Sequence, residues 1–212
     1  MLPSLTTHII GVSGGSCSGK THFVRSLIEE VGPSKISGIE HDSYYRGLAG
    51  TPHTQRRSIN YDHPSALDTE LLTSHLHSLL RGHTINVPIY DYTTHSRKDL
   101  TVTVKPTPFI VVEGILIYHH PELRNIFNLS VYIHAPAYVR LGRRLKRDVK
   151  ERGRTYFSVL RQYLSTVHRA HNRFVRPTRH FADIQINGLH NYSSSIQHIK
   201  SILISPHSTT HQ

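Results

Sequence analysis

The sequence Gly14-Gly15-Ser16-Cys17-Ser18-Gly19-Lys20-Thr21 fits the phosphate-loop pattern G-x-x-x-x-G-K-[ST]. An apolar run at residues 8–12 precedes the loop and predicts a short buried strand. Beyond the loop, apolar residues recur at helical spacing over residues 23–31, and Gly32-Pro33 ends that pattern. A strand before the loop and a helix after it form the setting in which this pattern binds phosphate, so a chance match is a poor explanation.

The residue types of the loop suit a triphosphate. Glycines let the backbone turn tightly, so that successive N–H groups converge on phosphate oxygens. The N-terminus of the following helix adds the positive end of its dipole. Lys20 is expected to reach the β- and γ-phosphates, and the Thr21 hydroxyl to ligate Mg²⁺. The loop therefore predicts a nucleoside triphosphate site formed by Gly14, Gly15, Ser16, Cys17, Ser18, Gly19, Lys20 and Thr21, and it leaves the phosphoryl acceptor open.

Length and composition indicate one soluble α/β domain over residues 1–212. No apolar stretch approaches the ~18 residues of a membrane span. The first residues lack the basic region and apolar core of a signal peptide. We therefore expect an intracellular, cytoplasmic protein without a membrane partner, and a disordered polar tail at residues 205–212.

The formal net charge of +11 favours a polyanionic ligand. Basic residues are densest between Arg140 and Arg154, and no nucleic-acid-binding module is recognisable, so we assign the charge to nucleotide rather than nucleic acid. The one cysteine, Cys17, excludes an internal disulfide framework. It is expected to serve as a small side chain in the loop, with a reactive thiol at a helix N-terminus as the alternative. Most of the nineteen histidines are expected at the surface, not in a structural zinc site.

Alternating strand and helix patterns predict a three-layer P-loop fold with a parallel central sheet. Strands are expected at residues 8–12, 35–40, 109–112, 129–133 and 184–186, and residues 84–104 indicate a β-hairpin insertion. Besides the helix after the loop, helices are expected from Pro64 to Gly82, over residues 138–152, from about Thr155 and around residues 196–203. The side chains expected on their buried faces are Leu67, Leu71, Leu72, Leu76, Leu79 and Leu80; Leu141, Leu145 and Val149; and Val159, Leu160, Tyr163, Leu164 and Val167.

Two carboxylates are placed to take part in phosphoryl transfer. Asp42 and Glu113 both follow predicted strands, and the carboxyl ends of parallel strands gather at one edge of a sheet. Asp42 could take a proton from the acceptor hydroxyl, and Glu113 could hold Mg²⁺ directly or through water. The alternative is that either carboxylate only caps a helix or turn.

Arginines are concentrated in residues 144–154, called the lid segment below. With a phosphate loop in the same chain, this segment is interpreted as a mobile lid that brings guanidinium groups onto a triphosphate. Without that loop, a solvated basic helix face would be the simpler interpretation. The arginines concerned are Arg144, Arg147, Arg152 and Arg154.

Several longer blocks resemble the uridine kinase / uridine–cytidine kinase family, P-loop nucleoside kinases of the phosphoribulokinase/uridine kinase superfamily, over nearly the whole chain. Asp-Ser-Tyr-Tyr-Arg at 42–46, the block at 60–68 and the block at 143–154 are the specific ones. The blocks are Gly-Val-Ser-Gly-Gly-Ser-Cys-Ser-Gly-Lys-Thr at 11–21, Asp-Ser-Tyr-Tyr-Arg at 42–46, Asn-Tyr-Asp-His-Pro-Ser-Ala-Leu-Asp at 60–68, Pro-Ile-Tyr-Asp-Tyr-Thr-Thr-His-Ser-Arg at 88–97, Val-Glu-Gly-Ile-Leu at 112–116 and Arg-Arg-Leu-Lys-Arg-Asp-Val-Lys-Glu-Arg-Gly-Arg at 143–154.

The resemblance implies Mg²⁺-dependent phosphorylation of the 5′-hydroxyl of uridine or cytidine, with ATP as donor, GTP as an alternative donor, and a homotetrameric assembly. It implies that Asp42 is the catalytic base and a metal ligand beside Thr21 and Glu113, and that Lys20 and Arg147 act on the phosphates together with Arg152. Asp62 and Arg144 resemble the pair that holds the ribose hydroxyls. The implied nucleobase residues are Tyr61, Tyr90, Tyr92, His95, Arg154 and Gln162.

The sequence also departs from the family, at His134, at Tyr138 and in a short, weakly basic stretch at residues 186–191 that would lie near the adenine. These departures bear on the choice of donor nucleotide. A related kinase of nicotinamide riboside or phosphoribulose type, and a nucleoside-binding protein without turnover, stay as alternatives. A GTPase-like switch is disfavoured, because no Asn/Thr-Lys-x-Asp motif is present.

Overall fold

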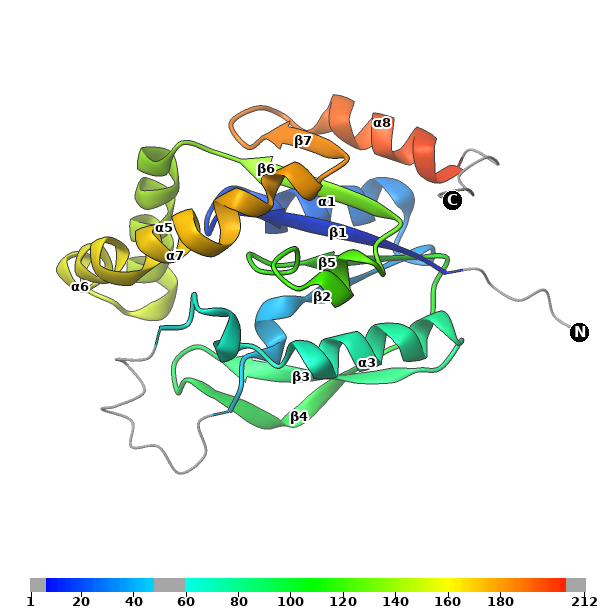
Figure 1. Ribbon diagram of the computed structural model, residues 1–212, viewed down its shortest axis with the longest axis horizontal. Coiled ribbons are helices and arrows are strands. Elements are labelled where there is room, and N and C mark those ends of the chain that lie inside the picture. The colour runs from blue at the N-terminus through cyan, green and yellow to red at the C-terminus, as the bar shows by residue number, and fades with distance from the viewer. Residues whose placement is uncertain (1–6, 48–59, 205–212) are drawn as a thin grey trace, which may run out of the picture.

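The computed structural model describes residues 7–47 and 60–204 (Figure 1). Its central sheet is parallel and five-stranded, in the order β2-β5-β1-β6-β7. The strands are β1 (His8–Gly14), β2 (Ile36–Glu40), β5 (Phe109–Glu113), β6 (Leu129–His134) and β7 (Ile184–Asn187). The parallel sheet expected from the sequence is confirmed, and the predicted tail at residues 205–212 lies outside the described residues.

Each face of the sheet carries its own apolar core, which gives the three expected layers. Successive residues of β1 point to opposite faces, so Ile9 belongs to one core and Ile10 to the other. Helices α1 (Lys20–Val31) and α8 (Ser193–Ile204) cover the Ile10 face. Helix α3 (Thr69–Leu80) covers the Ile9 face, together with the antiparallel hairpin of β3 (Ile85–Asp91) and β4 (Ser96–Val104), as Figure 1 shows.

The helix expected from Pro64 begins later than predicted. Residues Pro64–Ala66 form a separate 3-10 turn, η2, and Leu67 pairs with Tyr45 in an isolated antiparallel bridge. Asp68 then caps α3 by accepting a hydrogen bond from the Leu71 N–H at 3.3 Å. Leu72, Leu76 and Leu79 are fully buried as expected, whereas Leu80, 39 % exposed, is not part of the core.

Helix α5 (Ala137–Arg152) buries a different face from the predicted one, displaced by one residue along the helix. Its buried positions are Arg140, Arg144 and Asp148, spaced four apart, whereas the predicted inward residues Leu141, Leu145 and Val149 are only half-buried. The apolar periodicity was misleading because the surface that α5 faces is polar: it contains the phosphate loop and the next helix.

The segment after α5 is helical but irregular. Helix α6 (Tyr156–Gln162) is followed by the π-helix η3 (Tyr163–Val167), a short α7 (His168–Ala170), the π-helix η4 (His171–Val175) and the 3-10 helix η5 (Arg176–Phe181). Val159, Tyr163 and Val167 are buried as expected, but Leu160 and Leu164 are 40 % and 61 % exposed. Buried positions four residues apart turn these two leucines to the outer side.

The remaining elements are the 3-10 turn η1 (His41–Tyr44) after β2 and a one-turn helix, α4 (Pro121–Arg124), which the sequence analysis did not predict. No helix in the described part of the chain is both long and apolar enough to span a bilayer.

Candidate active site

The phosphate loop leaves β1 in a backbone conformation that requires glycine. Gly14 and Gly19 have φ values of 146° and 113°. A side chain at Gly14 would overlap the Ile133 carbonyl, and one at Gly19 the Tyr192 hydroxyl. Cys17 adopts φ 61° and lies half-buried in the loop. This alternation of conformations is the kind that points successive N–H groups toward one anion.

Lys20 and Thr21 begin α1 at the base of the loop. The Lys20 Nζ donates to the carbonyls of Gly14 and Gly15, both at 3.1 Å, and burial lowers the pKa of this amine although the Glu113 and Asp42 carboxylates oppose the shift. The Thr21 hydroxyl donates to Glu113 Oε2 at 3.0 Å. Burial raises the pKa of Glu113 to about 7, against the opposing influence of Lys20.

A cavity of about 640 Å³ opens above this loop. It brings together Lys20, Thr21, Asp42, Glu113 and Arg147, which the sequence analysis had predicted to surround the phosphates. Its other side chains and backbone come from Ser16, Cys17, Gly19, His22, Glu40, Gly114, Ile115, Arg143, Gly188, Leu189, His190, Asn191 and Tyr192. Residues 188–191, the second part of the weakly basic stretch at 186–191, therefore contribute to the cavity wall.

Glu40 is a cavity residue that the sequence analysis missed. It is the last residue of β2 and lies directly opposite Glu113, the last residue of β5, in the parallel register. Burial and the Asp42 carboxylate raise its pKa. Its position at the end of a strand was the signal that could have identified it, since the same signal identified Glu113.

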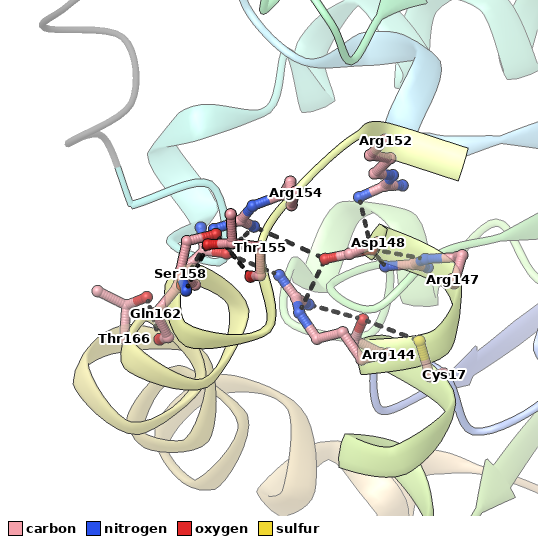
Figure 2. A network of polar contacts seen from close by, with 11 residues as sticks. Cys17, Arg144, Arg147, Asp148, Arg152, Arg154, Thr155, Ser158, Gln162 and Thr166 are labelled. Carbon is pink, nitrogen blue, oxygen red and sulfur yellow. Dashed lines mark hydrogen bonds and ion pairs between the residues drawn. The ribbon is translucent and has the colours of Figure 1, made fainter. Parts of the chain in front are cut away.

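The lid segment converges on one carboxylate. Figure 2 shows the guanidinium groups of Arg144, Arg147, Arg152 and Arg154 around Asp148, at 3.4, 2.8, 3.5 and 3.6 Å from its oxygens. Asp148 has no solvent exposure. Sequence analysis gave it no role, because a carboxylate within a basic helix resembles an ordinary surface ion pair.

Arg144 links this cluster to the phosphate loop. It donates to the Ser16 hydroxyl at 3.0 Å and to Gln162 Oε1 at 3.2 Å, and Gln162 also accepts from Arg154. Three residues expected at the ribose and the nucleobase, Arg144, Arg154 and Gln162, thus form one network beside the loop (Figure 2).

Four predicted nucleobase residues form an aromatic cluster, three from the hairpin together with Tyr61. Tyr61 stacks on His95 with ring centroids 4.9 Å apart, and Tyr90 and Tyr92 meet edge to face at 5.3 Å. Tyr45, which the sequence analysis quoted without a role, contacts both Tyr61 and Tyr90. Among the described residues, none of these aromatic side chains lines the cavity over the loop.

Arg97 attaches the hairpin to the η1 turn, which contains Asp42. Its guanidinium donates to the carbonyls of Tyr45 and Tyr44 at 2.8 and 2.9 Å and forms an ion pair with Asp68 at 3.2 Å. The sequence analysis missed this role, because the partners lie on η1 and at the start of α3, far along the chain.

Asp62, the predicted ribose residue, is a buried carboxylate. Burial raises its pKa, and the positive charge of Arg144 opposes that shift. Within residues 7–47 and 60–204 its carboxylate makes no ion pair. The two members of the predicted ribose pair are therefore near enough to interact electrostatically without contacting each other.

Comparison with known proteins agrees with this geometry. The family model described as Phosphoribulokinase / Uridine kinase family matches residues 9–194. The chain belongs to this family. It is a P-loop kinase, which confirms the family resemblance drawn from the blocks at 42–46, 60–68 and 143–154.

Curated relatives match over most of their length. A uridine kinase of Geobacillus kaustophilus is 46 % identical over 178 residues, covering 84 % of each chain. Uridine kinases of Chloroflexus aggregans and Clostridium perfringens are 44 % and 45 % identical, over 85 % and 86 % of this kinase and 86 % and 88 % of their own chains.

Solved structures support the fold alone, since their sequences are remote. A possible uridine kinase from Bacillus stearothermophilus superposes with a TM-score of 0.59 at 19 % identity, over 85 % of this kinase and 88 % of that chain. A phosphoribulokinase from Rhodobacter spheroides gives 0.63 at 15 % identity, over 87 % and 71 %.

Proposed function

We propose that this kinase transfers the γ-phosphoryl group of ATP to the 5′-hydroxyl of uridine or cytidine and forms the nucleoside monophosphate. The observation that carries the proposal is the position of Asp42. Its carboxylate lines the cavity over the phosphate loop and also accepts a hydrogen bond, at 3.2 Å, from Tyr92 of the aromatic hairpin. A base at the boundary between a triphosphate site and an aromatic acceptor site is what phosphorylation of a nucleoside hydroxyl requires. The names of the curated relatives support the same substrate.

Each group has a chemical task in this reaction. Asp42 accepts the proton of the 5′-hydroxyl as that oxygen attacks the γ-phosphorus. Lys20 and Arg147 offset the negative charge on the phosphate oxygens, and the backbone N–H groups of the loop hold the remaining oxygens in place. In phosphoryl transfer this positioning and charge compensation supply most of the rate enhancement.

The residues suit Mg²⁺ as the accompanying cation. Thr21, Asp42 and Glu113 offer one hydroxyl and two carboxylates at the edge of the cavity, an all-oxygen set of the kind that Mg²⁺ prefers. Bound there, the cation would neutralise charge on the β- and γ-phosphates. Glu113 must be ionised for this task, and the Thr21 hydrogen bond favours that form.

We assign the selection of the acceptor nucleoside to Asp62, Arg144 and the aromatic cluster. Asp62 and Arg144 supply an acceptor and a donor for the two ribose hydroxyls. A buried Asp62 that lost its hydroxyl partner would be left unsatisfied, which disfavours deoxyribose. Tyr90 and His95 are proposed to read the edge of the pyrimidine and Tyr61 to pack on its face, as the family resemblance implies. On the same basis we infer one kinase domain and a homotetramer in the cytoplasm.

The test is ADP release with ATP and Mg²⁺, with uridine, cytidine, deoxycytidine, nicotinamide riboside and ribulose 5-phosphate supplied in parallel. We expect release with uridine, with cytidine or with both, and at least ~10²-fold lower kcat/KM for deoxycytidine. Release only with nicotinamide riboside or ribulose 5-phosphate would keep the kinase and replace its substrate. No ADP release with any of the five acceptors, combined with tight uridine binding, would instead favour a binding protein without turnover.

A further inference from the structure

Three parts of the site meet at the Tyr92 side chain, which follows β3 in the hairpin. Its hydroxyl donates to Asp42 Oδ2 at 3.2 Å. The guanidinium carbon of Arg152, from the lid segment, lies 4.2 Å from the centre of its ring. The edge-to-face contact with Tyr90 ties it to the aromatic cluster. Tyr92 thus contacts the proposed catalytic base Asp42, the lid segment and the aromatic cluster at the same time.

The Tyr92 hydroxyl is suited to hold a carboxylate. A phenol is protonated at neutral pH, so its hydroxyl is the donor and the Asp42 carboxylate the acceptor. A hydrogen bond to an ionised oxygen is stronger than one between neutral groups. This hydrogen bond fixes the orientation of the Asp42 carboxylate and leaves Oδ1 open to a substrate hydroxyl, while Oδ2 keeps a second acceptor position.

The ring of Tyr92 is suited to hold the lid segment. A guanidinium over a tyrosine face is attracted by the negative π cloud of the ring. Arg152 also forms an ion pair with Asp148 at 3.5 Å, so the ring is connected to the carboxylate that gathers the other arginines. One face of the ring is therefore occupied by a cation and cannot pack on a pyrimidine.

We propose that Tyr92 is a positioning residue, which orients Asp42 for proton transfer and couples that orientation to the arginines of the lid segment, rather than a residue that packs on the nucleobase. This inference rests on the proposed function, in which Asp42 is the base. It replaces the role that the family resemblance implied for Tyr92 and leaves the roles of Tyr61, Tyr90 and His95 unchanged.

The experiment compares Tyr92→Phe with Tyr92→Leu in the intact chain, using whichever acceptor the wild type phosphorylates. Tyr92→Phe keeps the ring under Arg152 and removes only the hydroxyl. We expect kcat to fall by about tenfold, while the KM and the calorimetric Kd of the acceptor stay within about twofold. Tyr92→Leu removes the ring as well, so we expect an additional rise in the KM for ATP. Tyr156→Phe, which removes a hydroxyl from a residue 65 % exposed on α6, is the matched control and should leave kcat and the acceptor KM unchanged.

A double-mutant cycle gives a readout that a merely structural tyrosine would not affect. Because Tyr92 acts through Asp42, Tyr92→Phe should have no further effect on kcat in an Asp42→Asn background. A raised acceptor KM with unchanged kcat in Tyr92→Phe would instead assign Tyr92 to the nucleobase and overturn the inference. Additive effects in the cycle would also overturn it. If the wild type turned over none of the acceptors, the proposed function and this inference would both be rejected. If the wild type turned over an acceptor and Tyr92→Phe had the same kcat, only the inference would be rejected.

Discussion

The carboxylate of Asp148 lies 2.8 Å from the guanidinium of Arg147, its neighbour in the chain, although Asp148 has no solvent exposure and Arg147 is about a third exposed. Arg144, Arg152 and Arg154 approach the same carboxylate to within 3.6 Å. One buried negative charge thus gathers several positive ones and leaves a local excess of positive charge. Such an arrangement holds the arginines together before a triphosphate arrives and leaves them attractive to it.

Asp148→Asn should therefore damage both stability and donor binding. Removing the charge leaves the guanidinium groups to repel one another, and we expect about 2 kcal/mol lower stability, a modest value for a buried pair because three of the arginines retain contact with water. The KM for ATP should rise at least about fivefold. Urea unfolding and initial-rate kinetics measure the two effects. Glu151→Gln, on the exposed side of the same helix, is the control, and an equal effect of both variants would show that the position of Asp148 is not special.

Asp42→Asn tests the base directly. The amide keeps the size of the side chain but cannot accept the hydroxyl proton, so turnover should fall by at least ~10² while acceptor binding is largely retained. Steady-state kinetics and calorimetric titration with the preferred nucleoside measure these two quantities. Unchanged turnover would remove Asp42 from the role of base and would make the neighbouring Glu40 the first alternative to examine, since it lines the same cavity.

The contact between Thr21 and Glu113 predicts a specific dependence on Mg²⁺. Thr21→Val and Glu113→Gln each remove one oxygen ligand or its charge, so both should raise the Mg²⁺ concentration for half-maximal activity by about tenfold or more. ATP binding measured in the presence of a chelator should change much less, because the loop and Lys20 remain. Glu70→Gln, on the exposed side of α3, serves as the control. An unaltered Mg²⁺ requirement in both variants would place the cation elsewhere.

The parts of this site that the sequence predicted are those encoded locally. The phosphate loop is a contiguous pattern, and Asp42 and Glu113 follow apolar strands whose ends must meet in a parallel sheet. Tertiary contacts decided the rest. Arg97 binds Asp68 and the Tyr44 carbonyl, partners that no local spacing connects to it. The contact of Tyr92 with Asp42 joins residues fifty positions apart.

The buried face predicted from apolar periodicity was wrong for α5, because the rule behind the prediction did not apply there. The rule that the apolar stripe of a helix faces inward presumes an apolar partner surface. Helix α5 instead buries Arg144 and Asp148, which hydrogen-bond or pair with polar groups of the loop and of the lid segment. The same rule gave a wrong prediction for Leu164, which lies in the π-helix η3 and is 61 % exposed.

His41 gives the kinase a predictable dependence of stability on pH. The ring has no solvent exposure, its Nε2 lies 3.5 Å from the Thr69 hydroxyl, and that hydroxyl lies 3.3 Å from His120 Nε2. In the described part of the chain its Nδ1 has no hydrogen-bond partner, so a proton there would gain no acceptor. Burial lowers the pKa of His41 to about 3, and the positive charge that His120 can carry adds to this effect.

The sign of the pH effect follows from linkage. Between pH 6.5 and about 3 the unfolded chain binds a proton at His41 and the folded chain does not, so stability is fully present above pH 6.5 and is lost as the pH falls. From pH 7 to pH 5 this single group should cost about 2 kcal/mol of unfolding free energy. Urea unfolding at pH 7, 6 and 5 measures it. In His41→Gln the loss should shrink by about that amount, whereas His77→Gln, at an exposed position of α3, should retain the full pH dependence. If wild type and His41→Gln lost stability in parallel, the proton uptake would have to be assigned to other histidines such as the half-buried His171, whose pKa burial also lowers to about 3.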